Sequence, residues 1–224
     1  MTRLFAPGGR ASKPAWQRIA LPDADVALHT NWLPPSEADA LLENLLATVP
    51  WETHRIKMFG RELDSPRLSC WIGDDGASYT YSRTRFEPHP WPDALAALRT
   101  RVASACDARF NSVLANLYRD GNDSMGWHSD DEPELGEQPV IASVSLGATR
   151  LFRLRRKLPH GVRASPDDMA RVPLSHGSLL RMAGDTQHFY RHDVPKSRVE
   201  TRPRISLTFR WVEPSPGQQR PKTD

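Results

Sequence analysis

The chain has 224 residues, of which 38% are hydrophobic and 25% charged, a balance typical of a globular protein and not of a disordered chain or a membrane protein. No apolar run approaches the roughly 20 residues that span a bilayer, and the first residues lack the apolar core of a secretory signal. Arginine supplies 25 of the 30 basic residues although the net charge is only +3; this suits an anionic partner but is equally explained by a GC-rich genome.

In chain order, the sequence predicts one domain between two disordered ends. Residues 1–18 are rich in glycine, proline and basic residues and predict a mobile arm, and residues 213–224 predict a tail. A first helix is expected to open with Ser36 as its capping residue. Its apolar stripe consists of Leu41, Leu42, Leu45 and Leu46. A second helix begins near Pro92. Its predicted buried side consists of Leu95, Leu98, Val102 and Cys106.

After Arg109 the pattern changes to short runs of β-forming residues separated by Gly, Pro and Asp turns. The predicted strands are 112–118, 140–146, 150–155, 178–182 and 205–211. Strands that follow two helices indicate an α+β fold that is mainly β, with a jelly-roll (double-stranded β-helix) core in residues 19–212 and helices packed on one sheet.

Two cysteines, Cys70 and Cys106, form neither a C-x-x-C pair nor a disulfide framework. A structural zinc site is therefore not expected, and a reducing compartment is the simpler interpretation. We expect a cytoplasmic protein, associated with the nucleoid if it is bacterial.

Candidate metal ligands occur in the sequence Trp127-His128-Ser129-Asp130. His128 and Asp130 are two residues apart, so on an extended strand both side chains leave the same face. A distant histidine would complete two imidazoles and one carboxylate, the set that holds ferrous iron and leaves positions open for substrate and oxygen. An H-x-D motif alone is a weak signal, and spacing alone does not choose between His188 and His192 as the third ligand.

The last predicted strand carries a second functional pattern. Its polar residues, Arg204, Ser206, Thr208 and Arg210, alternate strictly with apolar ones. One face of such a strand packs into a core, while the other presents two arginines toward something anionic.

Ordered motifs along the chain resemble the AlkB family of iron- and 2-oxoglutarate-dependent oxygenases, and most closely the members that repair alkylated DNA. The resemblance covers residues 58–211 and keeps both order and spacing. The motifs that carry it are 116–118 (NLY), 127–133 (WHSDDEP), 141–150 (IASVSLGATR), 176–180 (HGSLL), 192–196 (HDVPK) and 203–210 (PRISLTFR).

The resemblance implies a complete cofactor site. It selects His192 over His188, so that His128, Asp130 and His192 would bind Fe(II), with O2 as the second substrate. Arg204 would pair with the distal carboxylate of 2-oxoglutarate and Arg210 would help to hold the end that chelates iron. Further contacts to 2-oxoglutarate would come from Asn116, Tyr118 and Ser206. Ser206 departs from the family, whose founding member has asparagine there, and its shorter hydroxyl suggests a weaker contact.

A nucleic-acid face is expected in residues 55–86, which resemble the family's nucleotide-recognition lid. Tyr79 and Tyr81 would share one face of an extended segment, followed by Arg83 and Arg85, and aromatic rings beside arginines suit a flipped base and its phosphates. An amphipathic core strand is the alternative. Phe59 resembles an apolar wedge that fills the gap left by base flipping, but a buried hairpin residue is equally compatible.

Three further groups of side chains are candidates for nucleic-acid contact. Arg67 resembles a lid contact, and Asp131 and Glu132 could attract a cationic methylated base. Arg153 and Arg155 belong to a basic run that could follow phosphates, although solvated loop charges are the alternative.

Together these features predict oxidative demethylation of alkylated nucleobases, such as 1-methyladenine and 3-methylcytosine, with release of formaldehyde and succinate. The expected partner of this repair enzyme is alkylated DNA, single- or double-stranded, with RNA as an alternative; the protein is expected to be monomeric. Two other hypotheses are a hydroxylase or demethylase of a protein or small molecule, and a non-catalytic nucleic-acid-binding barrel. The complete ligand triad and both arginines make the last the weakest.

Overall fold

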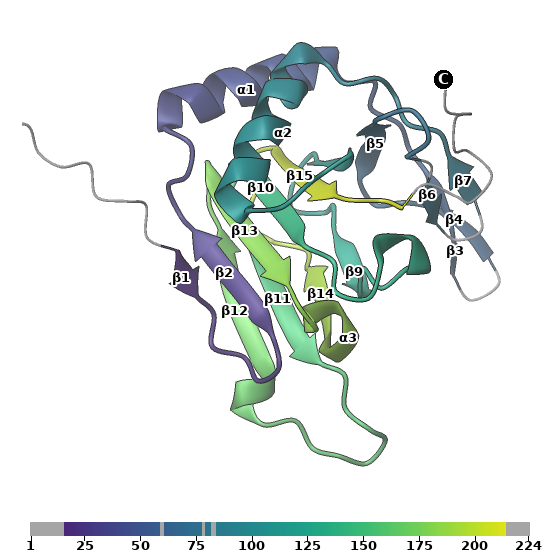
Figure 1. Ribbon diagram of the computed structural model, residues 1–224, viewed down its shortest axis with the longest axis vertical. Helices are drawn as coiled ribbons and strands as arrows, with labels where there is room; N and C mark the ends of the chain where they lie inside the picture. Colours follow the sequence, from purple (N-terminus) through teal and green to yellow (C-terminus); the bar gives the residue numbers. More distant parts are fainter. Residues whose placement is uncertain (1–15, 59–60, 78, 82–83, 214–224) are drawn as a thin grey trace, which may run out of the picture.

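The computed structural model describes residues 16–58, 61–77, 79–81 and 84–213. Its core consists of two antiparallel sheets (Figure 1). The large sheet contains, in spatial order, β1 (Gln17–Arg18), β2 (Asp25–His29), β13 (Ser178–Ala183), β10 (Ile141–Gly147), β15 (Arg204–Arg210), β8 (Ser112–Tyr118) and β5 (Leu68–Gly73). The small sheet contains β12 (Met169–Leu174), β11 (Arg150–Arg156), β14 (Tyr190–Val194) and β9 (Met125–His128). This is the predicted jelly-roll type of core.

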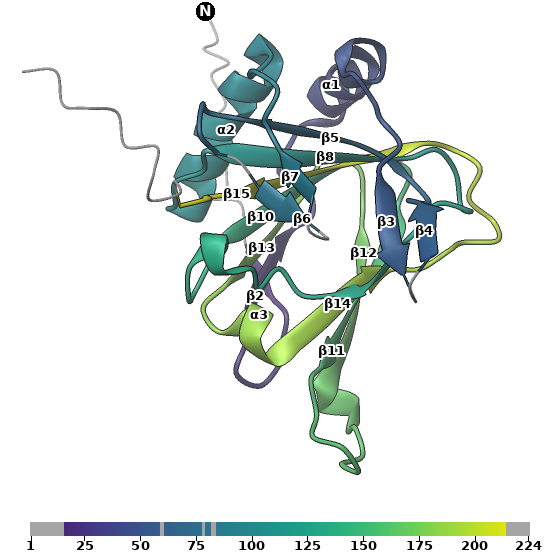
Figure 2. The same cartoon turned by 90° about the vertical axis from the view of Figure 1, so that its right-hand side faces the viewer.

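Two helices cover one face of the large sheet, as expected. Helix α1 (Pro35–Thr48) and helix α2 (Asp93–Cys106) lie side by side there in both views (Figures 1 and 2). The remaining helical segments are short: η1 (Pro133–Leu135), η2 (Pro166–Asp168) and α3 (Thr186–Phe189). In the described part of the chain, no helix has the length and apolar character needed to cross a membrane.

Strand β15, in the interior of the large sheet, shows how the core and the site are separated. Ile205, Leu207 and Phe209 are completely buried on the face that meets the helices. The alternate residues point to the other face, toward the small sheet, where a second apolar cluster surrounds a pocket. The alternation predicted from the sequence is therefore confirmed, and both of its faces are buried.

Two hairpins stand apart from the core. They are formed by β3 (Arg55–Met58) with β4 (Arg61–Asp64) and by β6 (Tyr79–Tyr81) with β7 (Thr84–Phe86). Both lie near β5, on the side of the molecule away from β1 and β2 (Figures 1 and 2). They occupy the segment in which the sequence predicts a lid.

Three local predictions need correction. Helix α1 begins at Pro35, and its N-cap, Pro34, makes no side-chain hydrogen bond, so Ser36 is not the cap. Of the predicted leucine stripe, Leu45 is buried and Leu41 and Leu42 pack half-buried against the core, but Leu46 is exposed. The predicted N-terminal arm is too long, since Gln17 and Arg18 pair with β2. The buried side of α2 is confirmed.

Candidate active site

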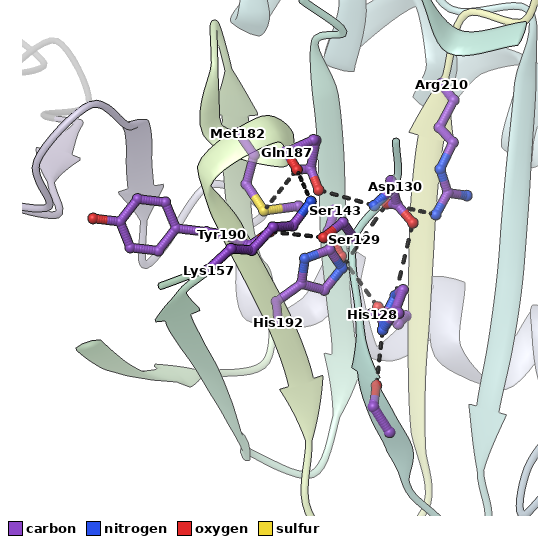
Figure 3. A network of polar contacts seen from close by, with 12 residues as sticks. His128, Ser129, Asp130, Ser143, Lys157, Met182, Gln187, Tyr190, His192 and Arg210 are labelled. Atoms are coloured by element: carbon purple, nitrogen blue, oxygen red, sulfur yellow. Dashed lines mark hydrogen bonds and ion pairs between the residues drawn. The ribbon is translucent and has the colours of Figure 1, made fainter. Parts of the chain in front are cut away.

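Three predicted metal ligands converge between the two sheets. His128 ends β9 and lies opposite His192 of β14 in the sheet register, while Asp130 follows two residues after His128. The Asp130 carboxylate lies 3.7 Å from His128 Nε2 and 4.0 Å from His192 Nε2. One ligand atom from each of the three side chains lies within 4.8 Å of the others. Figure 3 shows the three side chains pointing toward one another.

Neighbouring groups orient each of these ligands. His128 Nδ1 lies 2.8 Å from the carbonyl oxygen of Gly126, so this nitrogen donates and Nε2 keeps its lone pair for a metal. The backbone N–H of Asp130 donates to Gln187 Oε1 at 3.0 Å, and Arg210 donates to Asp130 Oδ2 at 2.8 Å. The carboxylate is thereby fixed from two sides.

Burial and local charge set the protonation of the triad. Burial lowers the pKa of His192 to about 3, and it also lowers the pKa of His128. Burial acts to raise the pKa of Asp130, but the charge of Arg210 and its hydrogen bond to the carboxylate outweigh it, and the net pKa lies below the usual value. Near neutral pH the site therefore offers two neutral imidazoles and one carboxylate, the states in which these groups bind a divalent metal.

The structure resolves the choice between the two candidate histidines. His188 lies in α3 and is exposed, and its ring makes an edge contact with Phe189. His192 is buried and its ring centroid is 4.2 Å from that of His128. Only His192 joins the triad.

A buried guanidinium shares the pocket with the triad. Arg204 is 1% exposed, and its Nη2 donates to Ser145 Oγ at 2.9 Å. Its Nε and Nη1 have no acceptor among the described residues. Burial lowers the pKa of Arg204 to about 10, so the group is still a cation at neutral pH. A buried fork with two unused donors is suited to a carboxylate, which it can bind in a bidentate manner.

The other predicted 2-oxoglutarate contacts line the same pocket. Across the β15–β8 pair, Arg204 lies opposite Tyr118 and Ser206 lies opposite Asn116. Ser206 Oγ is 3.1 Å from Ser143 Oγ, and Asn116 Oδ1 accepts a hydrogen bond of 2.7 Å from Arg67 Nε. The pocket thus runs from the metal ligands to Arg204 and is lined by side chains of both sheets.

Comparisons with known proteins show the family to which the chain belongs. Residues 8–210 match the model of the 2OG-Fe(II) oxygenase superfamily. The chain is 44% identical to the human alpha-ketoglutarate-dependent dioxygenase alkB homolog 3 over 194 residues, which cover 85% of this chain and 67% of that protein. The chain belongs to the AlkB family of 2OG-Fe(II) oxygenases.

Further relatives agree with this assignment. The oxygenase is 37% identical to the human DNA oxidative demethylase ALKBH2, over 92% of this chain and 80% of that protein. The solved structure of OsALKBH1 aligns at a TM-score of 0.57 over 88% of this chain and 99% of that one; at 15% identity this supports the fold alone. The predicted family and its Fe(II)- and 2-oxoglutarate-dependent dioxygenase activity are confirmed.

Most of the predicted lid residues lie where side chains are not described. Phe59 and Arg83 lie outside the described residues. For Tyr79, Tyr81 and Arg85 only the backbone is described: Tyr79 and Tyr81 belong to β6, and Arg85 lies opposite Thr80 in β7. The two tyrosines are thus two residues apart in one short strand, and their shared face stays a prediction from that spacing.

The other candidates for nucleic-acid contact occupy different places. Asp131 is exposed and pairs with Lys157 Nζ at 2.9 Å. Glu132 is half-buried and immediately precedes η1. Arg67 is buried behind Asn116 and also donates to Ser65 Oγ, so it supports the pocket wall and does not project from the lid surface.

Arg153 and Arg155 both point away from the active site, from the outer face of the small sheet. Each guanidinium lies over the ring of Trp127, at 5.0 and 4.6 Å from the ring centroid, respectively. Arg153 also makes an ion pair with Asp193. These two arginines therefore stand on strand β11, not on a solvated loop.

Sequence reasoning missed several residues that support the oxygenase site. Ser143 and Ser145 alternate along β10, a signal that could have placed them on the pocket face beside Ser206 and Arg204. Gln187 holds the backbone of Asp130, but it lies in a short helix and its sequence context gives no such signal. Arg150, at the start of β11, donates to three backbone carbonyls beside the ligand strands, which only the fold reveals.

Proposed function

We propose that the protein removes alkyl groups from damaged nucleobases by oxidation, releasing formaldehyde and succinate, and so repairs alkylated DNA. The observation that carries the proposal is the His128–Asp130–His192 triad in one pocket with a buried guanidinium that has unused donors. The relatives add the substrate class, since one of them is named a DNA oxidative demethylase.

The donor set fits the cofactors that the superfamily generally requires. His128, Asp130 and His192 would hold Fe(II), a metal that two imidazoles and one carboxylate suit. Bound iron, together with 2-oxoglutarate and O2, supplies the oxidising power that the side chains lack. Arg204 would take the distal carboxylate of 2-oxoglutarate, and Asn116, Tyr118 and Ser206 would contact the same molecule.

The chain's own residues position the reactants and exclude water. Arg210 neutralises and orients Asp130, and Gln187 fixes the same residue through its backbone N–H. Phe152 packs its ring at 5.2 Å from that of His192 and belongs to the apolar cluster around the pocket. A pocket of this kind strengthens each charge contact, because little water is present to screen it.

The substrate side of the proposal rests on the lid and on the acids beside the metal. Tyr79 and Tyr81 would stack on the flipped base, with Phe59 as a wedge in a duplex. Asp131 and Glu132 would favour a cationic base, such as 1-methyladenine or 3-methylcytosine. Arg67 would support the pocket wall through its hydrogen bond to Asn116. Phosphate contacts would come from Arg83, Arg85, Arg153 and Arg155.

The same proposal extends to the partner and the compartment. We take the acceptor to be single- or double-stranded DNA, with RNA as an alternative, and the protein to act as a monomer in the cytoplasm. Turnover of methylated single-stranded DNA, double-stranded DNA and RNA, compared in the assay below, shows which of these nucleic acids is preferred.

A direct assay tests the proposal. Protein with Fe(II), ascorbate and 2-oxoglutarate is incubated with oligonucleotides that contain 1-methyladenine or 3-methylcytosine, and formaldehyde and succinate are measured. We expect both products in equal amounts, and neither with the Asp130→Asn variant. Succinate without formaldehyde on every methylated strand, while a peptide or small molecule is hydroxylated, would move the reaction to another substrate class.

A further inference from the structure

The outer face of the small sheet carries an unusual set of side chains. Arg191 of β14, Arg153 and Arg155 of β11 and Arg171 of β12 alternate with more buried neighbours and point outward here. Buried Asp193 of β14 and half-buried Trp127 of β9 join them through their contacts to Arg153. We call these six residues the arginine face. It has four cations and a single acid, and it lies opposite the side of the sheet that carries His192.

The strand register brings these residues together. Arg153 lies between Arg171 and Asp193 in adjacent strands, and Arg155 lies opposite Arg191. Arg153 is committed to its ion pair with Asp193, and the Trp127 ring lies beneath both Arg153 and Arg155. The face is therefore a continuous row of cations across three strands, built on one indole ring.

Contacts within the protein explain only part of this arrangement. Asp193 and Trp127 provide partners for Arg153, and Trp127 provides a ring contact for Arg155. Arg155, Arg171 and Arg191 are exposed, and none of them has an ion-pair partner within the described ranges. Adjacent like charges in a sheet repel one another, so four cations with one acid do not serve the fold.

The arginine face is continuous with the active site through β9. This strand is the edge of the small sheet, and Trp127 and His128 are neighbours whose side chains leave opposite faces of it. A nucleic-acid strand that leaves the pocket over this edge needs to pass only one protein strand to reach Trp127. The neighbouring guanidiniums then offer phosphate contacts, and the indole offers a surface on which a base could stack.

We infer that the arginine face is a second binding surface for the substrate strand, which holds the phosphates of nucleotides that flank the one in the pocket. This inference rests on the proposed function for the identity of the strand. It adds Arg171, Arg191 and Trp127 to the residues that contact nucleic acid, and it assigns them to affinity for long strands and not to the reaction.

The test compares two double variants that each remove two exposed positive charges. R171Q/R191Q alters the arginine face, and R18Q/R109Q removes exposed arginines of β1 and of the loop after α2. Binding of an unmodified, dye-labelled single strand of about 20 nucleotides, longer than one binding groove needs, is measured by anisotropy over a range of salt concentrations. Turnover is measured on methylated strands of that length and on a short oligonucleotide that barely exceeds the target nucleotide.

For R171Q/R191Q we expect weaker salt dependence of binding to the long strand. The slope of log K against log salt concentration should become shallower by about 0.7 for each phosphate that the variant no longer neutralises. We expect its KM for the long strand to rise about 3- to 10-fold, with kcat and the short oligonucleotide unchanged. R18Q/R109Q should behave like the parent protein. Equal losses in both double variants would show that only net charge matters, and an equal loss on the short oligonucleotide would place these arginines at the pocket; either result overturns the inference.

The outcome for the proposed function is separate. If no methylated strand is turned over but the binding difference between the two double variants remains, the demethylase proposal fails and the surface stands. If turnover is normal and the two variants bind alike, the surface alone is wrong.

Discussion

Arg204 is a cation held in the interior without a carboxylate partner among the described residues. Removing a guanidinium from water is costly unless its donors find acceptors. The Ser145 hydroxyl satisfies one nitrogen, and Tyr118 places its ring under the group at 5.2 Å. The remaining donors gain their acceptors when an anion enters the pocket. We therefore propose that the cost of burial in the free protein is recovered as affinity for the carboxylate of 2-oxoglutarate.

Replacing Arg204 by lysine tests this geometry. A lysine keeps the charge but is a point donor that cannot form the bidentate pair. Losing one charge-assisted hydrogen bond of about 1.5–3 kcal/mol should raise the KM for 2-oxoglutarate on the order of 10- to 100-fold. Steady-state succinate formation over a range of 2-oxoglutarate concentrations measures this, and kcat at saturation should change less. An unchanged KM would mean that the co-substrate carboxylate binds elsewhere.

Asp131 is a candidate contact to the base, and an ion pair already partly neutralises its charge. Its carboxylate pairs with Lys157, and the same ammonium donates to the carbonyl of Gln187 at 2.9 Å. In the Lys157→Met variant the Asp131 charge is free to attract a cationic base. Because the pair is partly exposed, the effect is small: we expect KM for a 1-methyladenine strand to fall by up to about fivefold.

The double variant K157M/D131N provides the control for that prediction. It lacks the carboxylate, so the gain should disappear, and an uncharged alkylated base should show no gain in either variant. A fall in KM that is the same for charged and uncharged bases would instead indicate a general change at the pocket entrance.

At the scale of elements, Arg150 connects the chain segments beside β9 and β14, the strands that carry the predicted metal ligands His128 and His192. It is buried and donates to the carbonyls of Asp120 and Asp123, in the loop before β9, and of Pro195, just after β14. That loop is also bonded to the segment after β14 through Gly121, whose position has no room for a side chain. The relative position of His128 and His192 thus depends on contacts outside the pocket.

We therefore predict that Arg150→Met weakens metal binding although Arg150 touches no ligand. Leaving a buried carbonyl without a donor costs about 1–3 kcal/mol, so the variant should also be less stable. The control is Leu45→Ala, which empties part of the helix–sheet core far from the triad and should destabilise by about 2–5 kcal/mol. Titration calorimetry with Mn²⁺, at a temperature where both variants are folded, should show about a tenfold weaker Kd for Arg150→Met only. Equal metal affinity in the two variants would show that Arg150 contributes to stability but does not position the metal ligands.

The elements also differ in how far the sequence predicts them. Strand β15 could be predicted because its period-two alternation is a local signal that survives in the fold. Strands β9 and β14 were not predicted: β9 is short, and the pattern of β14 is interrupted by the two consecutive buried polar residues His192 and Asp193. Their pairing was accessible only through the family resemblance.

The supporting residues were harder to predict for the same physical reason. Gln187 and Arg150 act on backbone groups that are distant in the sequence, and a backbone acceptor carries no residue-specific signature. The capping prediction at Ser36 failed because two prolines precede it and already start the helix. Local patterns thus predict faces of strands, while the contacts between loops follow from topology.

At the scale of the whole molecule, the described chain forms three layers: two helices, the large sheet and the small sheet (Figure 1). Apolar packing concentrates between the helices and the large sheet, whereas the interior between the sheets combines an apolar cluster with the polar pocket. The reactive chemistry therefore sits on one side of the large sheet and most of the stabilising core on the other. Both cysteines belong to that core, Cys70 in β5 and Cys106 in α2.

The two buried cysteines provide a way to measure the stability of the helix–sheet layer. Burial raises the pKa of each thiol from 9.0 to about 12. In the unfolded chain the thiols ionise near 9, so between pH 9 and 12 the folded state holds more protons than the unfolded state, and stability falls as pH rises through this range. Below pH 9 this contribution is fully present. We predict that native protein at pH 8 reacts with a thiol reagent only as fast as it unfolds, and that both thiols react at once in denaturant.

Replacing both cysteines by alanine should flatten the alkaline limb of the stability curve, measured by urea unfolding at several pH values, while lowering stability at pH 7 because the core loses packing. A Ser104→Ala variant, which alters an exposed position of α2, is the matched control and should keep the alkaline limb. Fast labelling of one thiol in the native protein would show that its element opens locally. In that case the helix–sheet layer would not be the stable platform on which the oxygenase pocket is held.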